Sequence, residues 1–435
     1  MSEVLLAVLF VAALLGLLGS GVWIGAALLG VGLFAMETFT SRPVGPAMAT
    51  TIWSNISLWG LAALPLFVWM GEILLRTRLS ESLFNGLSPM VRRLPGGLLH
   101  VNIAGCTAFA AVSGSSAATL LTVGKLTVPE LRKRGYPDSL SCGTLAGAGT
   151  LGLLIPPSIT MIIYGIMVQE SIGRLFLAGI LPGLMLAALF FLYIFAWGLL
   201  SPNGRLMRES AASWREWLSG LIKLVPVLSL IVLVIGSIYT GIASPNEAAV
   251  IGVLGALGLS AVQGSLTLQS IVDSLMGTVR TTSMIVLLLA GSAVLTLAMG
   301  FTGLPRALAD WIGAMELSPI ALIVVLTVFY MILGCFLDGI SMIMLTIATV
   351  EPVVRTAGID MIWFGVFVVL VGEMALITPP VGFNLFLVQN LTGRDIGFVS
   401  RSAVPMFVLM LVGVVLLTAF PEIALWLPGT MTAKN

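Results

Sequence analysis

Long apolar stretches recur along the whole chain, and each is close to the roughly 20 residues that a helix needs to cross the hydrocarbon core of a bilayer. Of the 435 residues, 58% are hydrophobic and only 9% are charged. A soluble domain carries roughly 25% charged residues, so too little polar surface remains here to coat a water-soluble globule. The sequence therefore predicts an all-α polytopic membrane protein. We place its spans near residues 4–18, 22–38, 51–74, 140–169, 175–200, 224–242, 246–262, 281–301, 361–390 and 402–427.

The remaining residues exclude several function classes. A net charge of +1 provides no basic field for nucleic acid. Cys106, Cys142 and Cys335 lie in apolar or small-residue stretches without CxxC spacing, which is typical of small apolar packing residues. The single histidine, His100, cannot build a His-based metal site alone. GxSxG, Walker and HExxH motifs are absent, so we expect no enzyme and an ion gradient as the energy source.

Two further apolar segments, near 97–128 and 319–350, are predicted to form re-entrant hairpins. Basic clusters normally stay cytoplasmic, and two of them bracket the first segment from both ends, so it makes no net crossing. The second segment has acidic flanks and is expected to enter from the periplasmic side. Counting spans from the basic loops puts both termini outside. The bracketing basic residues are Arg76, Arg78, Arg92 and Arg93 on one side and Arg132, Lys133 and Arg134 on the other.

The two halves of the chain match each other at a constant offset of 223 residues, as in LLIPPS at 153–158 and LITPPV at 376–381. Each half is predicted to make five net crossings, an odd number, so the second half would be inverted relative to the first. Inverted repeats with broken helices are typical of secondary transporters. The matched pairs are Pro129 with Pro352, Gly135 with Gly358, Gly149 with Gly372, Pro156 and Pro157 with Pro379 and Pro380, and Pro182 with Pro405.

The first hairpin carries AVSGSSAATLL at 111–121, which we interpret as its tip. A tip inside the membrane must lie within protein or line a wet cavity, and its hydroxyls and carbonyls would be oxygen ligands for Na⁺ or a polar solute. Close helix packing by small residues is the competing interpretation of this motif.

The spans that follow each hairpin are predicted to break within the membrane. Pro156 and Pro157 lack N–H groups and disfavour helix before them, so the carbonyls of about 150–155 should be freed. A plain proline kink is the alternative, but the same pair recurs at Pro379 and Pro380, which favours a functional break.

Two acids lie in apolar surroundings, Asp338 in GCFLDGISM and Glu373 in VGEMALITPP. An ionised carboxylate at membrane depth costs at least ~2.5 kcal/mol, which makes both functional candidates. Asp338 occupies the position that matches Ser115 in the first hairpin. A structural role as partner of a backbone amide is the alternative.

These residues resemble the large membrane subunit of tripartite ATP-independent periplasmic (TRAP) transporters, the DctM-like family, over nearly the whole chain. Lys125 and Ala375 depart from the small residue and the glycine expected there. The resemblance is carried by PLFVWMGEIL (65–74), PGGLLHVN (95–102), AVSGSSAAT (111–119), VPELRKRGYP (128–137), GTLGLLIPPS (149–158), SIGRLFLAGILPG (171–183), GIASPNEAA (241–249) and EMALITPPVGFNLF (373–386).

The resemblance implies an elevator-type Na⁺ symporter of the ion-transporter superfamily with two or more Na⁺ sites. Carried over motif by motif, the substrate would lie between the hairpin tips, near Ser115, Ser116, Asp338, Ser341 and Asn384. The Na⁺ ligands would come from Ser113, Gly114, Ser116, Gly149, Thr150, Ile155 and Pro156 in the first half, and from Asp338, Gly339, Ile377, Thr378 and Pro379 in the second.

The family also implies partners, namely a small four-helix membrane subunit and a periplasmic binding protein that delivers a small organic anion, such as a carboxylate. Because no four-span block precedes residue 1, we expect the small subunit to be a separate chain in the cytoplasmic membrane. The expected division is 1–94 and 201–318 for scaffold and arm helices, and 95–200 and 319–435 for the transport elements. The alternatives are a stand-alone Na⁺/carboxylate symporter and a membrane enzyme or assembly subunit.

Overall fold

All regular structure is helical in the computed structural model, which describes residues 3–39, 43–77, 79–201, 213–303, 317–379 and 381–431 and the single positions 307, 310 and 315. Within this part, six helices are long and apolar enough to cross a membrane, and two bent helix pairs raise the number to eight. The six are α11 (Ile172–Leu200), α13 (Trp214–Tyr239), α14 (Pro245–Val262), α15 (Leu268–Thr302), α18 (Gly339–Thr356) and α21 (Ile396–Ala419).

The bent pairs interrupt two of the predicted spans. The helix expected over 51–74 is instead α3 (Val44–Ile56) followed by η1 (Trp59–Ala62) and α4 (Ala63–Leu75), with a bend of 57°. The second pair is α8 (Asp138–Gly149) and α9 (Leu151–Leu154) followed by α10 (Ile159–Val168), with a bend of 40°.

Several other helix bounds also differ from the predicted ones. α13 begins ten residues before 224 and α15 begins well before 281, because capping boxes start them among polar residues that hydropathy does not register. The span predicted over 402–427 ends at Ala419, and a separate α22 (Glu422–Gly429) follows Pro421. The helix α5 (Leu79–Val91) was not predicted at all.

Both segments predicted to be re-entrant hairpins form helix–turn–helix units, although α18 is by itself long and apolar enough to cross a membrane. The first is α6 (Leu99–Ser113) and α7 (Ser116–Lys133), and the second is α17 (Pro319–Gly334) and α18. The second broken span is also present, as α19 (Met361–Ala375) and α20 (Phe383–Thr392) with an irregular segment between them. The chain starts with α1 (Glu3–Gly19) and α2 (Ile24–Phe39).

The helix bounds repeat at the offset found in the sequence. Adding 223 to the bounds of α7 gives 339–356, which are the bounds of α18, and α8 and α19 begin at equivalent positions, 138 and 361. Helix contacts repeat as well. At the offset of 223, α2 is equivalent to α14, and α4 is equivalent to part of α15. The α2–α15 contact of the structure therefore has its counterpart in the contact between α14 and α4. The internal duplication therefore extends from sequence into packing.

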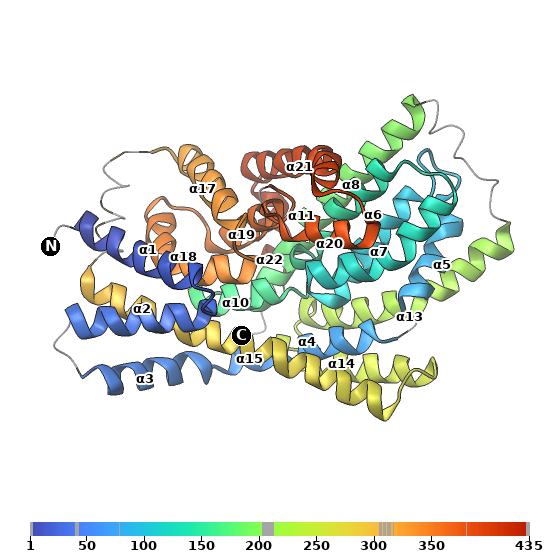
Figure 1. The fold of residues 1–435 in the computed structure, drawn as a ribbon. Coiled ribbons are helices and arrows are strands. Elements are labelled where there is room, and N and C mark those ends of the chain that lie inside the picture. The colour runs from blue at the N-terminus through green and yellow to red at the C-terminus, as the bar shows by residue number, and fades with distance from the viewer. Residues whose placement is uncertain are drawn as a thin grey trace.

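The helices form two sets that can be followed in Figure 1. In one set α2, α3 and α4 pack against α15, α4 packs against α14, and α13 packs against α5 and α14. In the other set the hairpins and broken helices pack together with α11 and α21, through α6 with α8, α7 with α20, and α17 with α19. The figure shows the α3–α14–α15 layer running beneath the hairpins and broken helices.

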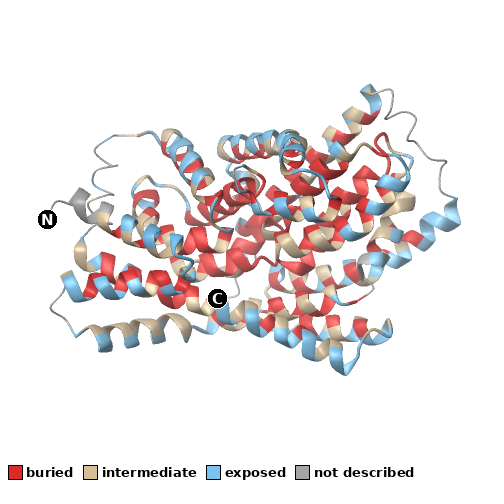
Figure 2. Cartoon of the chain, in the orientation of Figure 1, coloured by how far each residue is buried: buried red, intermediate tan, exposed pale blue. Residues whose placement is uncertain are grey.

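Helix α19 lies at the centre of the second set. All fifteen of its residues are buried, and it packs against α11, α17, α18 and α21. A helix that is apolar all round belongs inside a protein or a membrane, and this one is enclosed by protein. Figure 2 shows the buried residues gathered in this region, with exposed ones on the outer helices.

An ion-pair cluster ties the two halves together at the outer ends of these helices. Arg394 Nε donates to Asp138 Oδ2 at 2.7 Å, and Arg132 Nη2 lies 3.5 Å from the same oxygen. Arg132 also donates to the carbonyl of Thr392 at 2.9 Å. The start of α8 and the end of α7, from the first half, are thus joined to the end of α20, from the second.

Close glycine contacts between α11 and the start of α6 yield a stability prediction. A Cβ on Gly198 would lie 2.2 Å from the nitrogen of Gly96 and 2.3 Å from the carbonyl carbon of Pro95, both backbone atoms. We expect Gly198→Ala to destabilise the protein by about 1–3 kcal/mol, the usual cost of overpacking, measured as a lower Tm in detergent. The matched control is Gly258→Ala, where nothing lies within 4 Å, and equal Tm values for the two variants would contradict the prediction.

Candidate functional site

The tip of the first hairpin is a tight turn made by four consecutive small residues. Ser113 ends α6, Gly114 follows in the left-handed region at φ 59°, and Ser115 caps α7 by accepting from the nitrogen of Ala118 at 3.4 Å. A Cβ on Gly114 would lie 2.8 Å from the carbonyl oxygen of Pro157, so the tip approaches the broken helix through its backbone.

The first helix break falls in the predicted region. The helix turns irregular at Thr150, continues to Leu154 and is fully open at 155–158, before Ser158 caps α10. Because Pro156 and Pro157 have no N–H group, the carbonyls of residues 152 and 153 lose their usual donors. Both carbonyls lie within the range of about 150–155 that we predicted.

The hairpin tip packs directly onto this broken helix. Ser116 Oγ lies 3.0 Å from the carbonyl oxygen of Gly149, and a Cβ on Gly152 would lie only 2.5 Å from the carbonyl oxygen of Ser115. Ser113 Oγ is 2.7 Å from Thr119 Oγ1 within the hairpin. The structure thus brings 113–116 and 149–157 together, as the sequence predicted.

The second hairpin repeats the arrangement with different chemistry. Asp338 caps α18, its carboxylate accepting from the nitrogen of Ile340 at 3.2 Å and from Ser341 Oγ at 2.5 Å. This position is equivalent to Ser115, which caps α7. Gly339 approaches the broken helix at Gly372, since a Cβ added to Gly372 would lie 3.9 Å from the Cα of Gly339. Asp338 is exposed, whereas Ser341 is buried.

In the second break, the two carbonyls that the prolines deprive of helical donors accept hydrogen bonds from other backbone N–H groups. The carbonyl of Leu376 accepts from the nitrogen of Asn384 at 3.0 Å, and that of Ala375 accepts from Thr378 at 3.0 Å. These are the two carbonyls that Pro379 and its successor would otherwise leave without donors. Cys335 Sγ at the hairpin tip lies 3.5 Å from the carbonyl oxygen of Pro379. Ile377 is buried, and Pro380 lies outside the described residues.

A buried carboxylate connects the second broken helix to the first hairpin. Glu373 on α19 is 2% exposed, and its Oε2 lies 2.5 Å from Ser116 Oγ. Its other oxygen, Oε1, has no hydrogen-bond partner among the described residues, and the described ion pairs do not include it. Buried charges are normally paired or bind metal ions. Glu373 was a candidate from sequence, but its partner in the other half was not predicted.

The oxygen atoms around Ser116 outnumber the protons that can form hydrogen bonds between them. A serine hydroxyl carries one proton, yet Ser116 Oγ is close to both the Gly149 carbonyl and the Glu373 carboxylate, and Glu373 Oε1 is unpaired. Such a cluster can accept a cation or a further proton. Asn384, on the neighbouring helix α20, is fully buried, and both polar atoms of its side chain lack a partner among the described residues.

A family model described as the DctM component of the tripartite ATP-independent periplasmic transporter matches residues 10–423. The chain belongs to the DctM family. Members are large permease subunits of TRAP transporters, so this chain is a multi-pass membrane transporter permease and not an enzyme. The sequence resemblance is confirmed.

Curated relatives match over most of the chain. The C4-dicarboxylate TRAP transporter large permease of Pseudomonas aeruginosa is 31% identical over 88% of this chain and 89% of its own length. The sialic acid permease of Vibrio cholerae is 31% identical over 95% and 96%. The ectoine/5-hydroxyectoine permease of Ruegeria pomeroyi is 34% identical over 86% and 87%.

Solved transporter structures share the fold at low sequence identity. The YdaH transporter of Alcanivorax borkumensis aligns with a TM-score of 0.66 at 15% identity, covering 93% of this chain and 98% of that one. MtrF of Neisseria gonorrhoeae aligns with a TM-score of 0.55 at 13% identity, covering 91% and 94%. These likenesses establish the helical architecture alone.

The contact between the halves can be tested by a double-mutant cycle on Ser116→Ala and Glu373→Gln. Because these side chains touch each other inside the protein, we expect their effects on stability to be non-additive by about 0.5–3 kcal/mol, measured as Tm shifts of the purified protein. Ser116→Ala paired with Ser260→Ala on α14 is the control, since α14 packs mainly against α4 and α13 and not against α7. Additive effects in both pairs would mean that Ser116 and Glu373 are not coupled.

Proposed function

We propose that this DctM-family permease imports a small organic acid together with Na⁺, and that hairpins and broken helices form the binding centre. The single observation that supports this most is the oxygen cluster of Ser116, Gly149 and Glu373, in which both halves of the chain meet. Transporters of this architecture bind substrate and ions near the midplane, at the interface of two repeats.

The first Na⁺ site would use hydroxyl, carbonyl and carboxylate oxygens. The predicted ligands are Ser113, Gly114, Ser116 and the 149–156 segment, and the structure supports adding Glu373, whose Oε1 is buried without a partner. An extra positive charge would resolve the excess of acceptors around Ser116. Glu373 would then supply the compensating charge that a site of neutral oxygens lacks.

The second site is proposed at the equivalent place in the other half. Asp338 and Gly339 would contribute from the hairpin, and Ile377, Thr378 and Pro379 from the break. Thr378 Oγ1 donates to the carbonyl of Met374 at 2.8 Å, so its lone pairs stay available to a cation. Asp338 supplies the negative charge here, as Glu373 does in the first half.

The substrate anion would lie between the hairpin tips, near Ser115, Ser116, Asp338, Ser341 and Asn384. Helix N-termini favour anions, and α7, α10, α18 and α20 all begin at the tips and breaks. The N-terminus of α20, at Gly382, carries no side-chain cap. C4-dicarboxylate, sialic acid and ectoine relatives define the class of small solutes to test first.

Transport would proceed by movement of the hairpin-containing helix set against the set of α2–α5 and α13–α15. The division of contacts between the two sets supports an elevator motion. The remaining parts of the machine would be a small four-helix membrane subunit and a periplasmic binding protein, as the tripartite family implies.

Proteoliposomes that contain the full chain, its small subunit and its binding protein provide the test. We expect uptake of the anion that stabilises the binding protein to require an inward Na⁺ gradient. Glu373→Gln should lower the apparent Na⁺ affinity by about tenfold or more, as loss of a group that supports a metal ligand does. Asp273→Asn, an exposed acid on α15, is the control.

Two outcomes would contradict this proposal. Uptake driven by a proton gradient without Na⁺ would reject Na⁺ coupling. Full uptake by the purified chain alone would reject the tripartite assembly and favour a stand-alone symporter. An unchanged Na⁺ dependence in Glu373→Gln would remove Glu373 from the site while leaving the function itself intact.

A further inference from the structure

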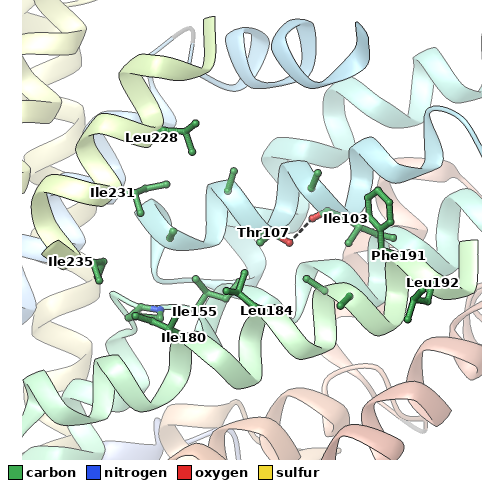
Figure 3. Close-up of a pocket in the computed structure, with 16 residues that line it drawn as sticks. Ile103, Thr107, Ile155, Ile180, Leu184, Phe191, Leu192, Leu228, Ile231 and Ile235 are labelled. Atoms are coloured by element: carbon green, nitrogen blue, oxygen red, sulfur yellow. Dashed lines mark hydrogen bonds between the residues drawn. The ribbon is translucent and has the colours of Figure 1, made fainter. Parts of the chain in front are cut away.

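A cavity of about 710 Å³ lies between the first hairpin and α13. Figure 3 shows side chains from three helices pointing into it, among them Ile103 of α6, Leu184 of α11 and Ile231 of α13. Ile155 and Pro156, at the first helix break, also line it. The volume falls within the range of about 300–1,000 Å³ that is usual for ligand pockets.

The wall of this cavity is almost entirely apolar. Thr107 is the only lining residue with a polar side chain, and its hydroxyl proton already goes to the carbonyl of Ile103 at 2.7 Å, which leaves only its lone pairs as acceptors. A polar solute would lose its water here and find no free donor and a single acceptor in exchange, which is unfavourable. The chemistry of the wall therefore selects a hydrocarbon ligand and excludes the transported anion.

The rim of the cavity is apolar and exposed. Leu184 and Leu192 on α11 are 50% and 62% exposed, and Leu228 on α13 is 44% exposed. Both helices are long enough and apolar enough to cross the membrane, so the exposed leucines lie in the hydrocarbon layer. The phase next to the opening consists of acyl chains.

We propose that an acyl chain of a bilayer phospholipid occupies this cavity. An empty apolar cavity would forfeit dispersion contacts along its whole wall, and a flexible hydrocarbon chain can restore them at the side chains of α6, α11 and α13. The chain enters between α11 and α13 and ends against the side chains of Ile155 and Pro156. The site therefore binds a component of the membrane, through residues that are separate from those proposed to hold the substrate.

The position of the cavity links lipid binding to movement. α6 and α11 belong to the set with the hairpins and broken helices, whereas α13 packs mainly against α5 and α14. A chain held here contacts both sets and the first break at once. Any displacement of one set against the other changes the shape of the cavity, so the acyl chain must slide or leave.

Photolabelling of the full chain in nanodiscs tests the proposal. The probe is phosphatidylglycerol with a diazirine in the middle of one acyl chain, and labelled peptides are identified by mass spectrometry. We expect the label to be concentrated on segments 103–111, 180–192 and 228–235, which line the cavity. A label spread evenly over all lipid-facing helices, α21 included, would overturn the proposal. This experiment uses the unmodified protein.

Variants that fill the cavity with larger side chains provide the second measurement. Ala108→Leu with Ala187→Leu adds volume at two lining positions, and we expect labelling of the three segments to fall about tenfold, equivalent to about 1.4 kcal/mol of lost binding. Ala261→Leu with Ala419→Leu makes the same change at exposed positions on α14 and α21 and should leave labelling unchanged. Equal labelling of both folded variants would reject the cavity as the binding site. Neither labelling measurement needs Na⁺, substrate or partner subunits. A failure of the lipid proposal can therefore be distinguished from a failure of the transport proposal.

Discussion

A backbone that opens inside a membrane must find partners for the groups that it frees, and this requirement governs the arrangement of the hairpins and broken helices. Each break is covered by the tip of a hairpin, and at the first break the contact is made backbone to backbone. The carbonyl oxygen of Ser115 lies so close to Gly152 that a Cβ there would be only 2.5 Å from it, which leaves no room for a side chain. Helix α4 completes the enclosure, since a Cβ on Gly71 would lie 3.0 Å from the carbonyl oxygen of Ser113. Small residues are therefore concentrated where irregular backbone needs close protein cover.

The two halves share their backbone plan but differ in chemistry. In the second half Ala375 stands where the first has Gly152, and the close approach is preserved because the hairpin supplies Gly334, whose Cβ position would lie 2.5 Å from Cβ of Ala375. Thr150 of the first half corresponds to Glu373 of the second, and Ser115 corresponds to Asp338. Acids thus replace hydroxyls only in the second half, yet Glu373 reaches across to Ser116 in the first. Each half therefore has access to one carboxylate.

Local chemistry made much of this fold predictable. Paired prolines disfavour a helix wherever they occur, and the repeat at an offset of 223 residues gave two independent indications of the same break. Helix starts among polar residues, as at Ser213 and Thr267, were placed too late because an apolar window does not recognise a cap. The contact of Ser116 with Glu373 could not be predicted, since it joins residues 257 positions apart and depends on which helices become neighbours. The apolar cavity depends on three-dimensional packing in the same way.

Exposure differs between the two tips and the breaks beside them. Ser115 is half-buried and Pro156 is buried, whereas their equivalents Asp338 and Pro379 are exposed. Ser116, next to Ser115, is 4% exposed. If each tip holds one ion, the two ions would not exchange with water at equal rates in this conformation. The ion beside Asp338 would dissociate first, and the ion beside Ser116 would be retained until the first hairpin moves. The protein would thus have a built-in order of loading and release, set by geometry and independent of any difference in intrinsic affinity.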